Sequence, residues 1–303
     1  MDIKEEMLLA LKHKKGDTFN LGSDLVYKNI NVGKIREMIG YPSLDITEDI
    51  KCEVLNIKGI TCYKYFKDDD KKYILFNIHG GGFYGGGAKV VENNSKYLAK
   101  NGITVVSIEY TLAPEKQYPN IMIEIYDVIK EYLKDNKYDK VGVIGDSAGG
   151  MLALNVATLD DENIIDFLGL YYPVISLTEK KQVSFDNLGE NAKASILFLK
   201  SVMPLVTKLY LPDNKSILED SEYGINSKYY NCLNIDKKLP EIQLIKAEFD
   251  YFNDEIDKFC NKYDIKAYEC KGLSHGFMEL LGYLPEVKDI LDLTVKHFKN
   301  KVK

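Results

Sequence analysis

The stretch VGVIGDSAGG, residues 141–150, followed by MLALNVA, residues 151–157, decides the fold. The β-branched run before Gly145 has the composition of a buried strand, and the Ala-rich segment after Gly149 has that of a buried helix. Between them, G-x-S-x-G fits a strand-to-helix turn so tight that side chains at the two glycine positions would clash. Such a turn holds Ser147 above the sheet. The pattern is common, so its meaning depends on partners elsewhere in the chain.

Composition excludes several classes of protein. The chain has 303 residues and a formal net charge of -6, which argues against a nucleic-acid partner. No apolar run approaches the roughly 20 residues that span a bilayer, and the first residues are charged where a signal peptide would be apolar. Five scattered cysteines without a C-x-x-C pair predict reduced thiols rather than a disulfide framework or a zinc site. We therefore expect a cytoplasmic globular protein without stable membrane association.

Strand-like and helix-like segments alternate through most of the chain, which predicts an α/β fold with a mostly parallel sheet and helices on both faces. Strands are expected at 51–57, 60–66, 73–78, 103–110, 140–144, 167–174, 242–247 and 266–270, and helices at 89–100, 118–136, 151–157, 254–263 and 285–299. The alternation breaks at 176–239, where we expect a helical insertion, including a helix at 194–209. Residues 1–50 form a separate helical arm, and 51–303 carry the main domain with this insertion.

A serine nucleophile needs a base, and the chain contains four histidines. His13 and His297 lie in polar, helix-like terminal segments and are expected at the surface. His275 lies in KGLSHGF, just after the last predicted strand, where open α/β folds place their ligand sites. We therefore predict that His275 is the base for Ser147.

The acid that orients this base should lie between them in sequence, because this turn goes with the order Ser, acid, His. Asp250 directly follows a predicted strand and is our choice. Asp254 and Glu248 are its rivals. Asp254 is more simply explained as a helix N-cap, and Glu248 lies within the strand.

The stretch HGGGF, residues 79–83, directly follows the third predicted strand. Three consecutive glycines cost backbone entropy and leave N–H groups accessible, which is typical of an oxyanion hole. We predict that Gly81 and Gly82 donate there together with Ala148, the residue after the nucleophile. His79 and Gly80 are expected to support the loop.

These motifs occur in the order HGGGF at 79–83, YTLAPE at 110–115, GDSAGG at 145–150, Asp250 with Asp254-Glu255, and HGF at 275–277. Together they resemble the hormone-sensitive-lipase-like (bacterial type IV) esterases of the α/β-hydrolase fold. The resemblance implies an eight-stranded sheet, a Ser147–Asp250–His275 triad, and a helical cap built from the N-terminal arm and an insertion after the sixth strand. Thr111 replaces the usual Arg of its motif, and Tyr251-Phe252 replaces the usual Pro-Leu after the acid.

The resemblance implies a serine carboxylic-ester hydrolase for small or short-acyl esters, with no metal or cofactor. Hydrolysis of amides or of an unusual ester on the same triad is an alternative, as is a non-catalytic binding homologue, although the presence of His275 argues against the latter. Members of the family are monomers or dimers, which leaves a homodimer open. Four aromatic residues flank the predicted site and are candidates either for substrate binding or for core packing: Phe83, Tyr84, Tyr171 and Tyr172.

Overall fold

A single sheet of eight strands organises the structure, a computed structural model that describes residues 1–15, 32–37, 44–68, 70–177, 183–213, 219 and 222–301. The strands lie in the order β1-β2-β4-β3-β5-β6-β7-β8. Pairing is antiparallel for β1 with β2 and for β2 with β4, and parallel for every other neighbouring pair. The mostly parallel sheet is therefore confirmed. Its strands are β1 (Lys51–Ile57), β2 (Ile60–Phe66), β3 (Tyr73–Ile78), β4 (Thr104–Ile108), β5 (Lys140–Asp146), β6 (Phe167–Tyr171), β7 (Glu241–Phe249) and β8 (Tyr268–Ser274).

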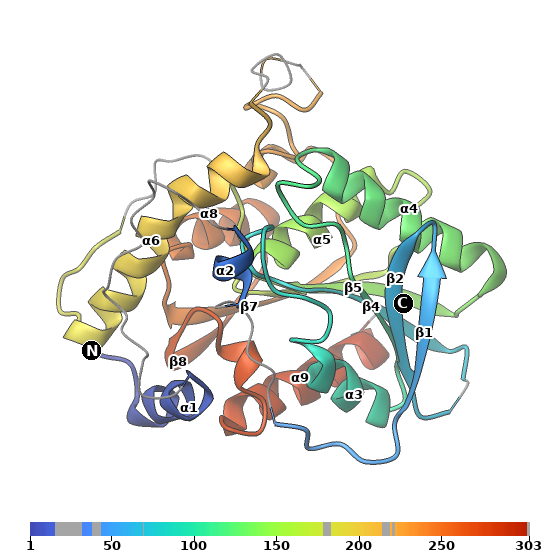
Figure 1. The fold of residues 1–303 in the computed structure, drawn as a ribbon, viewed down its shortest axis with the longest axis horizontal. Coiled ribbons are helices and arrows are strands. Elements are labelled where there is room, and N and C mark those ends of the chain that lie inside the picture. The colour runs from blue at the N-terminus through green and yellow to red at the C-terminus, as the bar shows by residue number, and fades with distance from the viewer. Residues whose placement is uncertain are drawn as a thin grey trace.

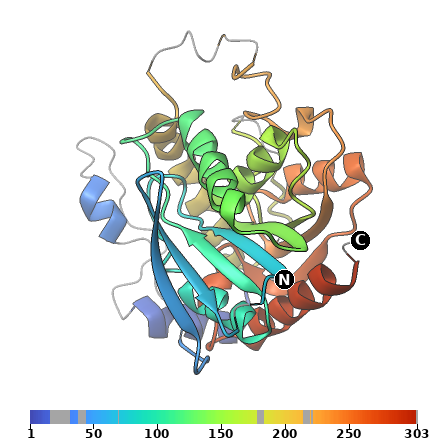
Figure 2. The ribbon, with the colours of Figure 1, turned by 90° about the vertical axis from the view of Figure 1, so that its right-hand side faces the viewer.

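Helices cover both faces of the sheet (Figures 1 and 2). One face carries α3 (Glu92–Lys100) and α9 (Pro285–Lys301), and the other carries α4 (Asn120–Asp135), α5 (Ala148–Leu159) and α8 (Asn253–Tyr263). Each helix buries an apolar side against the strands. The hydrophobic core is accordingly divided into two clusters, one on each face. β4 and β6 are buried along their whole length, as expected for central parallel strands.

Within the residues that the structure describes, three further helices lie outside the sheet layers: α1 (Glu5–Lys15), α2 (Val32–Glu37) and α6 (Glu190–Tyr210), the long helix at the upper left of Figure 1. The predicted helix at 194–209 lies within α6, which begins earlier. An N–H group in the first turn of α6 is satisfied by a residue far away in sequence, because the Asp2 carboxylate accepts a hydrogen bond from the Ala192 N–H at 2.7 Å. Two short 3₁₀ helices, η1 (Cys232–Asn234) and η2 (Phe277–Leu280), complete the elements named here.

Parts of the predicted arm and insertion, namely residues 16–31, 38–43, 178–182 and 214–218, lie outside the described residues. Within the described ranges, no helix is both long enough and apolar enough to cross a membrane.

The last strand extends to Ser274, four residues beyond its predicted end at Cys270. Ala247 pairs with Cys270, but Phe249 pairs with Ser274, so β8 contains a bulge between these pairs. Gly272 adopts a φ of +71° within it. The strand was predicted to end too early because Lys271 and Gly272 lie at the bulge, where the alternation of inward and outward side chains is interrupted. As a result His275 follows the strand end directly.

Candidate active site

The predicted site residues come from strand ends at one edge of the sheet. β3, β5, β7 and β8 run parallel, and each is followed at once by one of these residues: His79, Ser147, Asp250 and His275, respectively. Because carboxyl ends of parallel strands share an edge, residues separated by up to 196 positions in the chain are brought together here.

Ser147 occupies the turn between β5 and α5 with φ 54° and ψ -118°, a conformation that side-chain-bearing residues rarely adopt. A Cβ added at Gly145 would lie 2.3 Å from the Gly149 carbonyl oxygen, and one at Gly149 would lie 2.0 Å from the Ile78 carbonyl oxygen. The prediction that side chains at these two glycine positions would clash is therefore confirmed. Close backbone contact on each side holds the serine in its strained geometry.

A chain of two hydrogen bonds joins Ser147, His275 and Asp250. The Ser147 Oγ lies 2.7 Å from the His275 Nε2, and the His275 Nδ1 lies 2.7 Å from the Asp250 Oδ2. The Asp250 side chain is fully buried, and its Oδ1 accepts the Phe252 N–H at 3.0 Å. Asp250 is thus an acceptor on both oxygens. This fixes the Nδ1–H tautomer of His275 and leaves Nε2 free to accept the serine proton.

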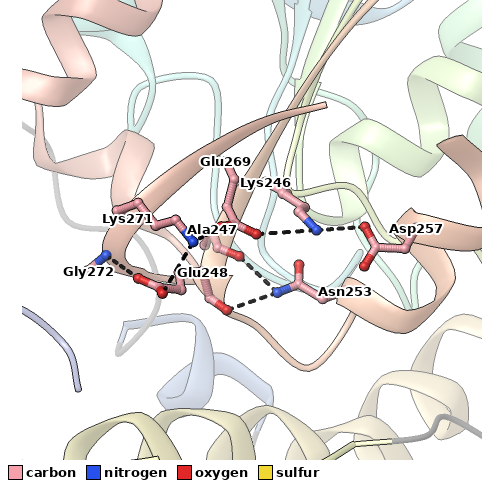
Figure 3. Close-up of polar contacts among 8 residues, drawn as sticks. All are labelled: Lys246, Ala247, Glu248, Asn253, Asp257, Glu269, Lys271 and Gly272. Carbon is pink, nitrogen blue, oxygen red and sulfur yellow. Dashed lines mark hydrogen bonds and ion pairs between the residues drawn. The ribbon is translucent and has the colours of Figure 1, made fainter. Parts of the chain in front are cut away.

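A polar network braces the two strand ends that carry this acid and base (Figure 3). Asn253 donates from Nδ2 to the carbonyl oxygens of Ala247 and Glu248 at 2.9 and 3.1 Å. The Glu248 carboxylate accepts a hydrogen bond from the Gly272 N–H at 2.7 Å and thereby satisfies a backbone donor in the bulge of β8. Glu248, one of the two alternatives to Asp250 as the acid, therefore links β7 to β8 and does not contact His275.

The other rival, Asp254, was expected to be the N-cap of α8, and this is wrong. Phe252 occupies the N-cap position, and Asp254 lies one residue inside the helix, where it forms an ion pair with Lys258 at 2.7 Å. The helix begins at Asn253, one residue earlier than predicted.

The glycine loop after β3 lies against the serine turn. Gly81 and Gly82 have φ values of +113° and +62°, and both line the same cavity as Ser147. The His79 Nδ1–H donates to the Gly80 carbonyl oxygen at 2.7 Å, and the His79 ring stacks on Tyr110 with centroids 4.2 Å apart. Ala148 is the first residue of α5, so its N–H has no acceptor within the helix.

Burial and neighbouring charges shift the pKa values of three groups here. Complete burial lowers the pKa of His79 to about 4, so this imidazole is neutral. Burial also lowers the pKa of His275, but the charge and hydrogen bond of Asp250, together with the charges of Asp146 and Glu279, outweigh it, so that the pKa is raised overall. Burial, with the Glu279 charge as a second cause, raises the pKa of Asp146 from 3.8 to about 7.

A cavity of about 230 Å³ opens onto Ser147 and His275. The glycine loop forms one wall, and a row of apolar side chains on one side of α6 forms another. Its remaining lining comes from α1, the end of β6 and the segment after His275. The lining residues that contribute side chains from these walls are Leu11, Phe83, Tyr84, Tyr172, Val174, Phe198, Leu199, Val202, Met203, Val206, Phe252, Glu279 and Leu280.

Three of the four aromatic candidates, Phe83, Tyr84 and Tyr172, line this cavity, whereas Tyr171 does not. Tyr171 belongs to the core on the α9 face, and its hydroxyl lies 3.0 Å from the Thr294 Oγ1. Tyr171 is the last residue of β6, whereas Tyr172 follows it in a turn with φ 37°, and its ring packs against that of His275 with centroids 4.7 Å apart. The expectation that Tyr171 contributes to a substrate pocket is therefore wrong.

A family model described as alpha/beta hydrolase fold matches residues 75–279, which include every residue of the hydrogen-bonded chain. The acetyl esterase of Salmonella schwarzengrund is 35% identical over 263 residues, which cover 80% of this chain and 77% of the esterase. The chain belongs to the hormone-sensitive-lipase-like esterases of the α/β-hydrolase fold. The predicted resemblance is thus confirmed, and the protein is a carboxylesterase-like serine hydrolase.

Two other known proteins are similar to this chain. Rabbit arylacetamide deacetylase is 31% identical over 186 residues, which cover 55% of this chain and 46% of the deacetylase. The solved structure of the hyperthermophilic esterase from the archaeon Pyrobaculum calidifontis matches with a TM-score of 0.77 and 21% identity, covering 99% of both chains. The latter supports the fold.

Several residues of this esterase site carried no signal in the sequence. Leu11 and the α6 side chains reach the cavity only through long-range packing. Asp146 lies inside a recognised motif, yet only the structure reveals the hydrogen bond that its Oδ1 accepts from the Gly80 N–H at 2.9 Å. Arg36 of α2 donates to the Tyr84 and Ala113 carbonyl oxygens at 2.7 and 2.8 Å. In the described part of the chain, no three His, Cys, Asp or Glu side chains cluster as metal ligands would.

Proposed function

We propose that the protein hydrolyses short-acyl carboxylic esters through an acyl-enzyme formed on Ser147. The observation that carries this proposal is the chain of hydrogen bonds from Ser147 through His275 to buried Asp250, both links at 2.7 Å, at the mouth of a small apolar cavity. This is the arrangement that a serine nucleophile requires.

The reaction proceeds in two halves. His275 Nε2 takes the proton of Ser147 as Oγ attacks the acyl carbon, while Asp250 stabilises the imidazolium through Nδ1–H. The oxyanion accepts hydrogen bonds from the backbone N–H groups of Gly81, Gly82 and Ala148. The loss of one such donor lowers the rate on the order of 10²- to 10³-fold. His275 then returns the proton to the leaving alcohol. A water molecule, deprotonated by His275, hydrolyses the ester bond to Ser147 and releases the acid.

The size of the cavity supports a short acyl chain. Its volume, about 230 Å³, lies below the roughly 300–1,000 Å³ that is usual for ligand pockets. Phe198, Met203 and Val206 of α6 line this cavity. A long acyl chain would have to displace these side chains.

Replacing the nucleophile tests the proposal. The variant Ser147→Ala should lose turnover of p-nitrophenyl butanoate to the background rate while its unfolding transition is retained. A fluorophosphonate probe should label the wild type and Ser184→Ala, whose exposed serine lies outside the site, but not Ser147→Ala. Butanoate turnover by Ser147→Ala at the wild-type rate would overturn the mechanism, and an unlabelled, inactive wild type would favour a binding homologue.

Amide hydrolysis is a second candidate, because rabbit arylacetamide deacetylase is 31% identical over 186 residues. The acylation chemistry is the same, but an amide demands a better-protonated leaving amine. The hydrolysis rates of p-nitrophenyl acetate and p-nitroacetanilide distinguish ester hydrolysis from amide hydrolysis, because the two substrates share the acyl group and the aromatic ring. An esterase cleaves the first with a far higher kcat/KM.

A further inference from the structure

The sequence contains a single arginine. Lysine and arginine together number 40, and Arg36 is the only arginine among them. An ammonium group is a compact charge, whereas a guanidinium is a planar fork that donates in several fixed directions at once. The two are therefore not interchangeable where one cation must hold several acceptors, and the surroundings of Arg36 in α2 are of this kind.

The guanidinium of Arg36 uses all three of its nitrogen atoms. Nε donates to the Tyr84 carbonyl oxygen at 2.7 Å, and Nη2 donates to the Ala113 carbonyl oxygen at 2.8 Å. Nη1 and Nη2 also donate to the two carboxylate oxygens of Glu115, at 2.8 and 2.5 Å. Bidentate, charge-assisted bonds of this type are about twice as strong as neutral ones. A lysine has three donors on one nitrogen and cannot make these four bonds.

Both carbonyl groups belong to the support of the glycine loop. Tyr84 lies inside a turn that is closed by a hydrogen bond of 2.9 Å from the Gly85 N–H to the Gly81 carbonyl oxygen. Ala113 comes from the segment after β4, and its N–H donates to the Phe83 carbonyl oxygen at 2.9 Å. The guanidinium therefore ties α2 to this turn and to the segment that braces it.

The backbone of this turn is one that its surroundings must hold in place. Gly81, Gly82 and Phe83 are consecutive and have φ values of +113°, +62° and +68°. A positive φ is costly for a residue such as Phe83, and strain of this kind persists only where neighbouring groups enforce it. Oxyanion donors act through being in place before the reaction begins. The contact at Tyr84 is made at the residue that directly follows this run.

We propose that Arg36 is a positioning residue, which holds the glycine loop in the conformation that lets Gly81 and Gly82 donate to the oxyanion. This inference rests on the proposed ester hydrolysis and deepens it, because it gives the N-terminal arm a part in the reaction. Arg36 acts through the loop backbone and does not touch the substrate.

The test uses p-nitrophenyl butanoate and its thionoester, in which sulfur replaces the carbonyl oxygen. Sulfur is a weak hydrogen-bond acceptor, so the thionoester gains little from the oxyanion hole. Both substrates use Ser147, His275 and the same cavity. The ester-to-thionoester ratio of kcat therefore reports on the oxyanion hole separately from the nucleophile and the cavity.

Two variants remove the fork. Arg36→Met should lower kcat for butanoate at least about tenfold and should lower the ester-to-thionoester ratio by a similar factor. KM should stay within about twofold, because oxyanion donors act in the transition state. Arg36→Lys keeps the charge without the fork, and it should also lower the ratio.

Lys262→Met is the matched control. Lys262 of α8 donates from Nζ to the Leu233 and Ile235 carbonyl oxygens at 2.6 and 2.8 Å, and it does not line the cavity. This variant, like Arg36→Met, removes a cation that holds two backbone carbonyl groups. It should leave the ester-to-thionoester ratio at the wild-type value.

A wild-type ratio in Arg36→Met would overturn the inference even if kcat fell, because the loss would then come from the fold or the cavity. Full wild-type kcat in Arg36→Lys, or an equal fall of the ratio in Lys262→Met, would overturn it as well. If Arg36→Met does not fold, Arg36→Lys carries the same comparison, and an unchanged ratio there has the same meaning. Failure of the proposed function is distinct, because the wild type would then not turn over butanoate.

Discussion

Gly80 donates its backbone N–H to Oδ1 of Asp146 at 2.9 Å, which joins the loop after β3 to the residue before the nucleophile. A Cβ at Gly80 would lie 2.5 Å from the Asp146 Oδ2, so this approach requires glycine. Gly81 and Gly82 follow directly. The Asp146 carboxyl group therefore fixes the start of the glycine loop relative to Ser147.

Asp146→Asn should change how stability depends on pH. Burial, followed by the Glu279 charge, raises the folded-state pKa of Asp146 to about 7 from 3.8. The folded state therefore holds this proton more tightly than the unfolded state does, and the free energy of unfolding falls as pH rises from about 4 to about 7. Asparagine keeps an acceptor for the Gly80 N–H without the charge. Between pH 5 and pH 8 the variant should gain on the order of 2 kcal/mol relative to wild type.

Urea unfolding at the two pH values measures this difference. Asp166→Asn is a suitable control, because Asp166 accepts the Val141 N–H at 2.9 Å but lies at the other end of the strands, away from the cavity. Wild type and Asp146→Asn losing equal stability between pH 5 and pH 8 would show that Asp146 does not titrate in this range.

Asp250→Asn should lower the pH at which activity begins. Burial lowers the pKa of His275, and it is outweighed by the Asp250 charge and hydrogen bond, the largest opposing causes, together with the charges of Asp146 and Glu279. Activity needs neutral His275, so in the wild type it is lost as pH falls through a pKa above the ordinary 6.5. Without the Asp250 charge, burial is opposed only by the smaller effects of Asp146 and Glu279, so the acidic limb of kcat/KM should move to lower pH. The rate itself should fall by about 10⁴-fold, because the tautomer is no longer held.

A pH profile of residual p-nitrophenyl butanoate hydrolysis gives both quantities. Glu248→Gln keeps the hydrogen bond to the Gly272 N–H and removes a carboxylate that does not contact His275, so its acidic limb should stay near that of wild type. An acidic limb that moves to higher pH in Asp250→Asn would contradict the assignment of Asp250 as the dominant charge on His275.

Local sequence patterns predicted the sheet and the meeting of Ser147, Asp250 and His275, because each residue follows a buried strand in a tight turn. The ends of the strands were placed within two residues, except those of β6, which ends three residues before its predicted end, and β8. The end of β8 was missed because its bulge places Lys271 and Gly272 where a ladder would require alternation. Asp254 was misassigned because α8 begins one residue earlier than predicted, so that the N-cap position falls on Phe252.

Residues that line the cavity were less predictable for a different reason. Tyr171 and Tyr172 are adjacent and identical, so the sequence does not tell them apart. The turn at Tyr172, with φ 37°, places this residue and not Tyr171 in the lining of the cavity that also contains Ser147. Leu11 and Met203 come from helices outside the sheet, where amphipathic periodicity shows that a side is buried but not what it covers. Such contacts depend on tertiary packing that no local pattern records.

Met203→Ala should shift the preferred acyl chain to greater length. Met203 is half-buried on α6 and lines the cavity together with Phe198 and Val206. Truncating it enlarges the space available to a substrate, and each methylene group that newly fits should raise kcat/KM by up to about fourfold. The wild type should prefer short chains in a series of p-nitrophenyl esters from acetate to octanoate, and the variant should reach its maximum at a longer one.

Leu197→Ala is the matched control, because Leu197 lies on the same helix but is 50% exposed and does not line the cavity. Loosening α6 as a whole would move both optima together, whereas a direct wall contact moves only that of Met203→Ala. The same optimum in wild type and Met203→Ala would mean that the acyl chain does not lie against α6.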